Sequence, residues 1–232
     1  MKKRKGKPRT KKLLEEKVSF STKLLDWAKL HEKQLYIAAI VLVLLIGSGW
    51  WYKNYKIHKE WRAQKQYSLI VSSYPTYNPK DVGKWKNVIK QLEKLLEEFD
   101  GTKTSYSARL DLANAYYHTG SYDKAIEVYE RLLDDLDSEH PYWQLVQFGL
   151  VYCYEGKKDY SKAITILEKV KANPHTTMMA LVHYNLGRIY EISGQKSKAL
   201  EEYKKYLENN RFGIFKVLVE EKVKALESHT LS

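Results

Sequence analysis

The chain has 232 residues, one cysteine and a net charge of +12 at pH 7. A lone cysteine excludes an internal disulfide framework. The sequence has only 5 prolines and 11 glycines, is rich in helix formers and lacks the apolar–polar alternation of strands, so it predicts an all-α fold.

The N-terminal segment, residues 1–34, is strongly basic. It contains 12 Lys or Arg and 4 Asp or Glu, and so carries +8 of the net charge of +12. Basic residues close to a bilayer are attracted to anionic lipid. We expect residues 2–12 to contact anionic lipid, with ribosomal RNA as the alternative partner.

The next segment is apolar. Residues 34–52 are 19 residues without a charged side chain. As a helix they would span roughly 28 Å, close to the hydrocarbon core of a bilayer at about 30 Å. We therefore predict one transmembrane helix over residues 35–52. Aromatic residues suited to the headgroup level flank it: Trp27 and Tyr36 on one side, and Trp50, Trp51, Tyr52 and Tyr55 on the other.

Two other interpretations of this segment stay open. A core helix of a soluble domain is disfavoured because such helices are usually amphipathic, and this one is apolar all round. A cleaved signal peptide is disfavoured because 34 residues precede the apolar run, whereas signal peptides begin with a short basic region. The excess of basic residues before the helix predicts a cytoplasmic N-terminus, with the C-terminal domain on the other side.

The rest of the chain contains a repeat of 36 to 38 residues. Three stretches align: LANAYYHTGSYDKAIEVYERLL from Leu112, FGLVYCYEGKKDYSKAITILEKV from Phe148, and LGRIYEISGQKSKALEEYKKYL from Leu186. Five positions correspond in all three: Ala113, Gly149 and Gly187; Tyr116, Tyr152 and Tyr190; Gly120, Gly156 and Gly194; Ala125, Ala163 and Ala199; Tyr129, Leu167 and Tyr203.

This pattern resembles the tetratricopeptide repeat (TPR), a pair of antiparallel helices that stacks into a solenoid. Small residues let the paired helices approach closely, and glycine after the first helix favours the left-handed conformation that ends it. The resemblance predicts an all-α solenoid after the anchor. Its expected parts are a juxtamembrane helix and loop at 53–80 (a degenerate first repeat helix), a TPR-like domain at 81–232 with core repeats at about 106–139, 142–175 and 180–211, and a capping helix at 212–228.

No motif points to chemistry. The sequence has no HExxH pair, Gly-rich phosphate loop or nucleophile elbow. We therefore predict no catalytic, cofactor-binding or metal-ligating residues, no small-molecule substrate, and a protein that is not an enzyme.

In such repeats the first helix of each unit lines a concave groove, here expected to bind extended apolar peptide or a partner helix. Leu110 stands where a carboxylate-binding groove would need lysine, so we reject that specificity. The predicted groove residues are Leu110, Asn114, Tyr117, Trp143, Val146, Gln147, Leu150, Tyr184 and Arg188.

The order of parts, with a Gly49-Trp50-Trp51-Tyr52 exit from the apolar run, is similar to the YfgM-like family of ancillary SecYEG translocon subunits. That resemblance implies a single-pass protein of the bacterial inner membrane with a periplasmic repeat domain. It implies the translocon, a PpiD-type periplasmic chaperone and extended client peptides as partners. The alternative is a TPR adaptor for envelope assembly or cell division that is not associated with the translocon.

Overall fold

The computed structural model describes residues 22–75, 81–209 and 213–230, so the predicted contacts of residues 2–12 lie outside the described part. The chain divides into two units, Met1–His58 and Lys59–Ser232. Within the described ranges the regular elements are all helices, which confirms the predicted all-α class. They are residues 22–30, α2 (Glu32–Ser72), α3 (Val82–Phe99), α4 (Lys103–His118), α5 (Tyr122–Asp134), α6 (Pro141–Gly156), α7 (Tyr160–Ala172), α8 (Met179–Ile192), α9 (Lys196–Asn209) and α10 (Lys216–Thr230).

The described part of the first unit, residues 22–58, has no core. None of the side chains from residue 22 to residue 58 is buried. Over the described part of the chain, α2 is the one helix whose length and composition would allow it to cross a membrane. Its large apolar side chains are exposed on every side of the helix: Leu35, Ile37, Ile40, Val41, Leu42, Val43, Leu44, Leu45 and Ile46.

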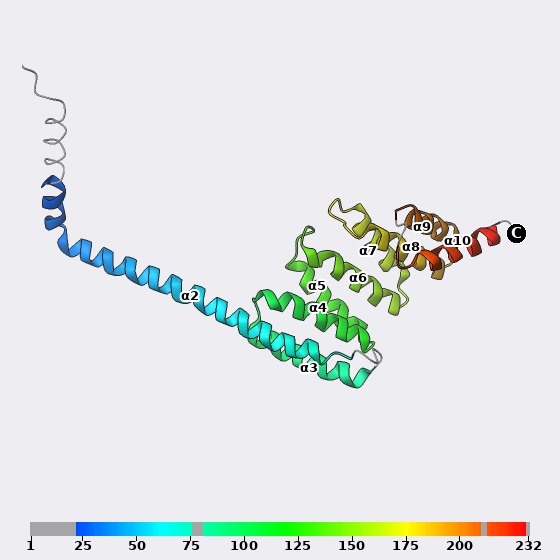
Figure 1. The fold of residues 1–232 in the computed structure, drawn as a ribbon, viewed down its shortest axis with the longest axis horizontal. Helices are drawn as coiled ribbons and strands as arrows, with labels where there is room; N and C mark the ends of the chain where they lie inside the picture. The colour runs from blue at the N-terminus through cyan, green and yellow to red at the C-terminus, as the bar shows by residue number, and fades with distance from the viewer. Residues whose placement is uncertain (1–21, 76–80, 210–212, 231–232) are drawn as a thin grey trace, which may run out of the picture. The chain divides into compact units, whose positions relative to one another are not determined.

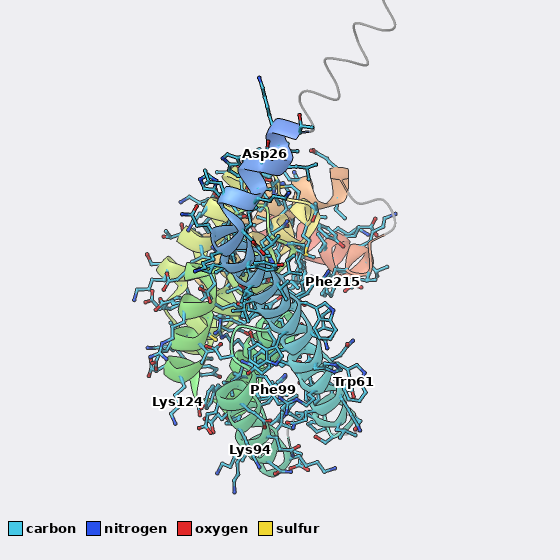
Figure 2. All side chains as sticks on the ribbon, turned by 90° about the vertical axis from the view of Figure 1, so that its left-hand side faces the viewer. Asp26, Trp61, Lys94, Phe99, Lys124 and Phe215 are labelled. Atoms are coloured by element: carbon cyan, nitrogen blue, oxygen red, sulfur yellow. The ribbon has the colours of Figure 1, made fainter. Side chains whose placement is uncertain are left out.

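The helices of the second unit are amphipathic and capped. In α3 the buried residues Trp85, Val88, Leu92, Leu95 and Phe99 recur every three to four positions, as one face of a helix requires. Figure 2 shows Phe99 inside the body of this unit and Trp61, on the second-unit part of α2, at its outer edge. Side chains cap the helix starts by accepting a hydrogen bond from a free backbone N–H: Asp81 on α3, Thr102 on α4 and Asp159 on α7.

The second unit is a solenoid. Each helix from α3 to α10 packs against the next, and α4 also contacts α6. The pairs α4–α5, α6–α7 and α8–α9 therefore follow one another as stacked layers (Figure 1). The core runs through the whole stack, with fully buried alanines at Ala113, Ala125, Ala163 and Ala199.

The second-unit part of α2 is bonded to the start of the solenoid. The Glu60 carboxylate accepts hydrogen bonds from the backbone N–H of Lys103 (2.7 Å) and Thr104 (3.0 Å), and so caps α4. Burial would raise the pKa of Glu60, but these bonds and the Thr104 hydroxyl outweigh it and lower the pKa. Further along α2, Tyr67 donates to Asp111 Oδ2 at 2.6 Å.

The turns that end α4, α6 and α8 share one hydrogen-bond pattern. In each, an N–H bonds to a carbonyl five residues earlier: Ser121 to Tyr116, Asp159 to Tyr154, and Gln195 to Tyr190. This is the Schellman pattern, in which the residue before the donor takes a left-handed conformation.

The left-handed residue is a glycine in two of these turns but not in the third. Gly120 (φ 73°) and Gly194 (φ 81°) take the conformation, as predicted. The prediction for Gly156 is wrong: α6 continues through it, and Lys158 (φ 62°) takes the left-handed position instead. The two inserted residues, Lys157 and Lys158, lengthen the end of the helix and move the turn.

Lys158→Gly is therefore expected to stabilise the protein by about 1 kcal/mol, since a side chain in the left-handed region costs roughly that much. Thermal unfolding followed by circular dichroism measures the effect. The matched control is Lys157→Gly, because Lys157 lies at φ −80° in the right-handed region and gains nothing from glycine. A lower melting temperature for Lys158→Gly would contradict this account of the turn.

Candidate protein-binding pocket

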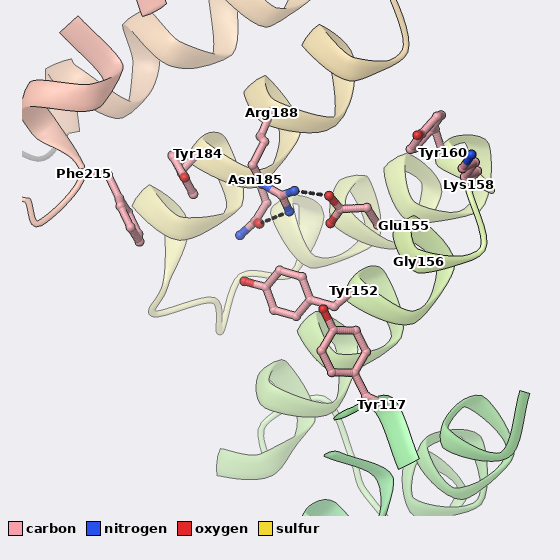
Figure 3. A pocket seen from close by; sticks show the side chains of 10 residues that line it. All are labelled: Tyr117, Tyr152, Glu155, Gly156, Lys158, Tyr160, Tyr184, Asn185, Arg188 and Phe215. Carbon is pink, nitrogen blue, oxygen red and sulfur yellow. Dashed lines mark hydrogen bonds and ion pairs between the residues drawn. The ribbon is translucent and has the colours of Figure 1, made fainter. Parts of the chain in front are cut away.

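An open pocket of about 540 Å³ lies where the first helices of three successive pairs meet (Figure 3). It is lined by the end of α4, the end of α6, the α6–α7 turn, the first residue of α7, the middle of α8 and the residue before α10. Its lining is Tyr117, Tyr152, Glu155, Gly156, Lys158, Tyr160, Tyr184, Asn185, Arg188 and Phe215.

Five of its ten lining residues are aromatic. Tyr184 and Phe215 are stacked, with ring centroids 4.2 Å apart and planes 6° apart. On the other side, Tyr117 and Tyr152 have centroids 6.4 Å apart and a tilt of 49°. Figure 3 shows the Tyr117–Tyr152 pair and the Tyr184–Phe215 pair on either side of Arg188 and Asn185.

The charges in the pocket are largely paired with each other. Arg188 Nη1 donates to Glu155 Oε1, and its Nη2 donates to Asn185 Oδ1 at 3.1 Å. The guanidinium also lies over the Tyr152 ring, 5.9 Å from its centroid. Both terminal nitrogens of Arg188 are thus already engaged.

The pKa values show the same balance. Burial disfavours the charge on Arg188, but the hydrogen bond and negative charge of Glu155 outweigh it, so the pKa of Arg188 rises. Burial raises the pKa of Tyr117 and of Tyr152. Both tyrosines are therefore neutral near pH 7 and offer apolar ring faces and hydroxyl groups rather than charge.

Three of the nine predicted groove residues line this pocket: Tyr117, Tyr184 and Arg188. Leu110 and Asn114 are half-buried and lie outside it. The side-chain oxygen of Asn114 is occupied, because Oδ1 accepts a hydrogen bond from the Tyr129 hydroxyl at 2.6 Å.

The remaining four predicted residues are buried and so present no surface. Trp143 is 6% exposed, and Val146, Gln147 and Leu150 are 0%, 2% and 4% exposed. The reason is that α6 lies in the middle of the stack and contacts α4, α5 and α7. Tyr152 and Glu155, in the last turns of α6, are half-buried and reach the pocket.

Sequence reasoning missed Tyr152, Glu155, Lys158, Tyr160, Asn185 and Phe215. The repeat alignment contained one signal for them, since Tyr152 stands at the repeated tyrosine position, two residues after the last expected groove residue of α6. Nothing local in the sequence indicates Phe215, which reaches the pocket from the segment before α10.

The described residues do not meet the requirements of a metal site or of a reactive cysteine. No group of three or more His, Cys, Asp or Glu side chains there could hold a metal ion. Cys153 is buried, and burial raises its pKa to about 12, so its thiol stays protonated near pH 7.

Solved structures share the fold. A putative kinesin light chain with nearly identical TPR-like repeats from Podosopora anserina has 18% sequence identity and a TM-score of 0.51, covering 73% of this chain and 96% of that one. A crystal structure of MamA has 21% identity and a TM-score of 0.51, covering 64% and 80% of the two chains. MamA from Desulfovibrio magneticus RS-1, residue 41 to the end, has 17% identity and a TM-score of 0.52, covering 73% and 91%.

No curated protein matches the sequence significantly. The sequence profile described as "Tetratricopeptide repeat-like domain" matches residues 26–228. The match covers most of the chain, including the apolar part of α2 and all the helix pairs that form the pocket. The chain therefore belongs to the tetratricopeptide repeat-like domain family.

Proposed function

We propose that this protein is a membrane-anchored TPR scaffold that binds protein partners outside the cytoplasm, as an ancillary translocon subunit linking secretion to periplasmic chaperones. The observation that carries the binding function is the pocket on α4, α6 and α8, in which an aromatic ring, Phe215, is stacked on Tyr184. A TPR domain of this kind is an interaction scaffold, and its pockets select the segments it binds.

The anchor is supported by the exposure of apolar side chains along α2. Leu42, Val43 and Leu44 are 57%, 68% and 66% exposed. A continuous apolar surface of this kind is unfavourable in water and is typical of a membrane interaction site. The family profile begins at residue 26, so the apolar segment belongs to the pattern of this family. We propose that residues 35–52 span the inner membrane once, that residues 1–34 are cytoplasmic, and that the repeat domain, 81–232, is periplasmic.

The lining of the pocket indicates the class of ligand. Stacked Phe215 demonstrates that an aromatic ring fits against Tyr184. Glu155 neutralises the charge of Arg188, so the guanidinium is not free to bind the carboxylate of a peptide C-terminus. We therefore expect an internal, apolar segment of the partner that inserts an aromatic side chain, rather than a C-terminus.

The identity of the partners rests on the similarity to YfgM-like proteins. It gives a SecYEG-type translocon, a PpiD-type chaperone and extended clients as candidates. A photocrosslinking residue in place of Tyr160, which lines the pocket, tests this in cells with the full chain. The control position is Lys124, an exposed residue on α5 that does not line the pocket.

Crosslinks from position 160 to translocon and chaperone subunits, absent from position 124, would support the proposal. Crosslinks from position 160 only to envelope-assembly or cell-division proteins would favour the adaptor alternative. Equal crosslinking from both positions would place partner binding outside the pocket.

Tyr184→Ala is expected to weaken binding of the partner by about 2 kcal/mol, roughly a thirtyfold rise in Kd, and so to reduce its copurification. The reason is that aromatic residues in pockets carry much of the binding energy of such interfaces. Ile192→Ala on the same helix is the matched control, because Ile192 is 49% exposed and lies outside the pocket. Tyr184→Phe keeps the ring and should keep binding. Loss of helicity in Tyr184→Ala would show that the ring is needed for folding instead.

A further inference from the structure

The described chain begins with a short helix, residues 22–30, that has two different sides. At 100° per residue, Leu24, Leu25, Trp27 and Ala28 fall within one half of its circumference. Lys23 and Asp26 lie on the opposite half, together with Leu30. The apolar side is open: Leu24 is 55%, Leu25 60% and Trp27 52% exposed.

This helix and α2 meet at an elbow. His31 forms a turn between them, its backbone N–H donating to Trp27 O at 3.1 Å and its ring stacking on Trp27 with centroids 4.8 Å apart. The chain changes direction there, at the blue end of the ribbon in Figure 1.

The inner side of the elbow holds an open hollow of about 560 Å³. Its lining is apolar except for two charged residues next to the turn, Lys29 and Glu32. The other lining residues are Leu25, Ala28, Leu35, Tyr36 and Ala39.

From this arrangement we infer that residues 22–30 form an interfacial helix that lies on the bilayer surface, with acyl chains filling the hollow of the elbow. This inference rests on the proposed membrane anchor. If α2 enters the bilayer at about residue 35, the helix at residues 22–30 lies along the membrane surface. The inner side of the elbow then faces the lipid. That side carries the apolar lining, and Lys29 and Glu32 lie at the turn, where headgroups would be.

Two further features fit a lipid surface as the occupant. Trp27 is placed at the level where indole rings are enriched in membrane proteins. Residues 1–34 carry +8, which attracts an anionic surface and would hold the helix against it. An anionic lipid surface accounts for both the apolar hollow that continues into the anchor and the strong positive charge beside it.

The test uses the full chain reconstituted in vesicles of phosphatidylethanolamine and phosphatidylglycerol. Cys153 is replaced by alanine, and a nitroxide is attached to a cysteine introduced by Leu25→Cys, Asp26→Cys or Val41→Cys. Relaxation of the nitroxide by oxygen, which concentrates in lipid, is compared with relaxation by a water-soluble nickel chelate. The label at position 25 should favour oxygen and the label at position 26 the nickel chelate, with the two ratios differing several-fold.

Water exposure at positions 25 and 26 alike, with position 41 in lipid, would overturn the interfacial helix while leaving the anchor intact. Lipid burial at both 25 and 26 would also overturn it, because the segment would then be inserted rather than lying at the surface. Water exposure at position 41 would refute the anchor itself, and the interfacial helix with it.

Discussion

Gly187→Leu is expected to lower the free energy of unfolding by about 3 kcal/mol, at the upper end of the usual cost of overpacking. Gly187 is buried on α8, where it faces Tyr203 of α9. A Cβ atom there would come within 2.5 Å of Tyr203 Cδ1, which real side chains do not tolerate. The Tyr203 ring has nowhere to move, since it is 1% exposed and its hydroxyl donates to Glu191 at 2.8 Å.

Thermal or denaturant unfolding of the full chain in detergent, followed by circular dichroism, measures this effect. Gly83→Ala is the matched control, because Gly83 is also helical but a Cβ there would meet only the Asp81 carboxylate at 3.4 Å. Because Gly83 lies in the first turn of α3 rather than in its interior, alanine should change the stability by less than about 1 kcal/mol. An unchanged melting temperature for Gly187→Leu would mean that α8 and α9 are not paired at this residue.

The second large effect is expected at Glu202, a buried carboxylate that joins three helices. Glu202 is 5% exposed on α9. Its Oε2 lies 2.6 Å from His183 Nδ1 on α8, and its Oε1 lies 3.4 Å from both Lys171 Nζ on α7 and Lys205 Nζ on α9. Glu202→Ala leaves the buried His183 Nδ1 without its acceptor, while Lys171 and Lys205 keep Glu168 and Glu201 as partners. Removing one member of a buried pair typically costs about 3–5 kcal/mol.

The same contacts predict a dependence of stability on pH. Burial alone would raise the pKa of Glu202, but the His183 hydrogen bond and the charges of Lys171 and Lys205 outweigh it and lower the pKa to about 2. Because the ionised carboxylate only accepts hydrogen bonds, His183 Nδ1 carries the proton and donates it. A folded-state pKa below the unfolded value gives stability that is fully present above about pH 4.5 and is lost as the pH falls toward 2.

Glu202→Gln should therefore have a lower free energy of unfolding than the native protein at pH 4.5, and most of that difference should disappear as the pH falls to 2. Denaturant unfolding across that range measures it. Glu201→Gln is the control, because the neighbouring Glu201 side chain is 64% exposed and pairs with Lys205 at the surface. Its effect should stay within about 0.5 kcal/mol at every pH. A Glu202→Gln deficit that does not change with pH would mean that the carboxylate contributes by packing alone.

Repeated residues in the sequence predicted the architecture well. Gly187 marks a close helix approach, and Gly120 and Gly194 mark the left-handed turns, because each of these features depends on one residue and its immediate backbone. The insertion of Lys157 and Lys158 was visible in the alignment. The effect of this insertion on the end of α6 could not be predicted, since the residues that pack beside an insertion decide whether it extends a helix or lengthens a turn. Here the absence of a side chain at Gly156 leaves room for the Tyr122 ring, which lies where a Cβ would be.

The pocket was harder to predict because it depends on long-range packing. The helical period placed Trp143 and Val146 on the expected groove side of α6, but burial is decided by the neighbouring helices, and these cover both residues. Tyr184 and Arg188 were found because they lie one helical turn apart on the half-buried face of α8, whose other middle residues are buried. Phe215 could not be found from periodicity, since it reaches Tyr184 from 31 positions along the chain.

The packing of each helix mainly on the next has a consequence for how the protein forms. Nearly all contacts join neighbours in sequence, so the chain has low contact order, and such chains fold fast because little loop-closure entropy must be overcome before contacts form. The α3–α4–α5 layer is complete before α8 and α9 have been synthesised. We therefore expect a growing chain to bury its apolar faces pair by pair, beginning at the N-terminal end of the solenoid.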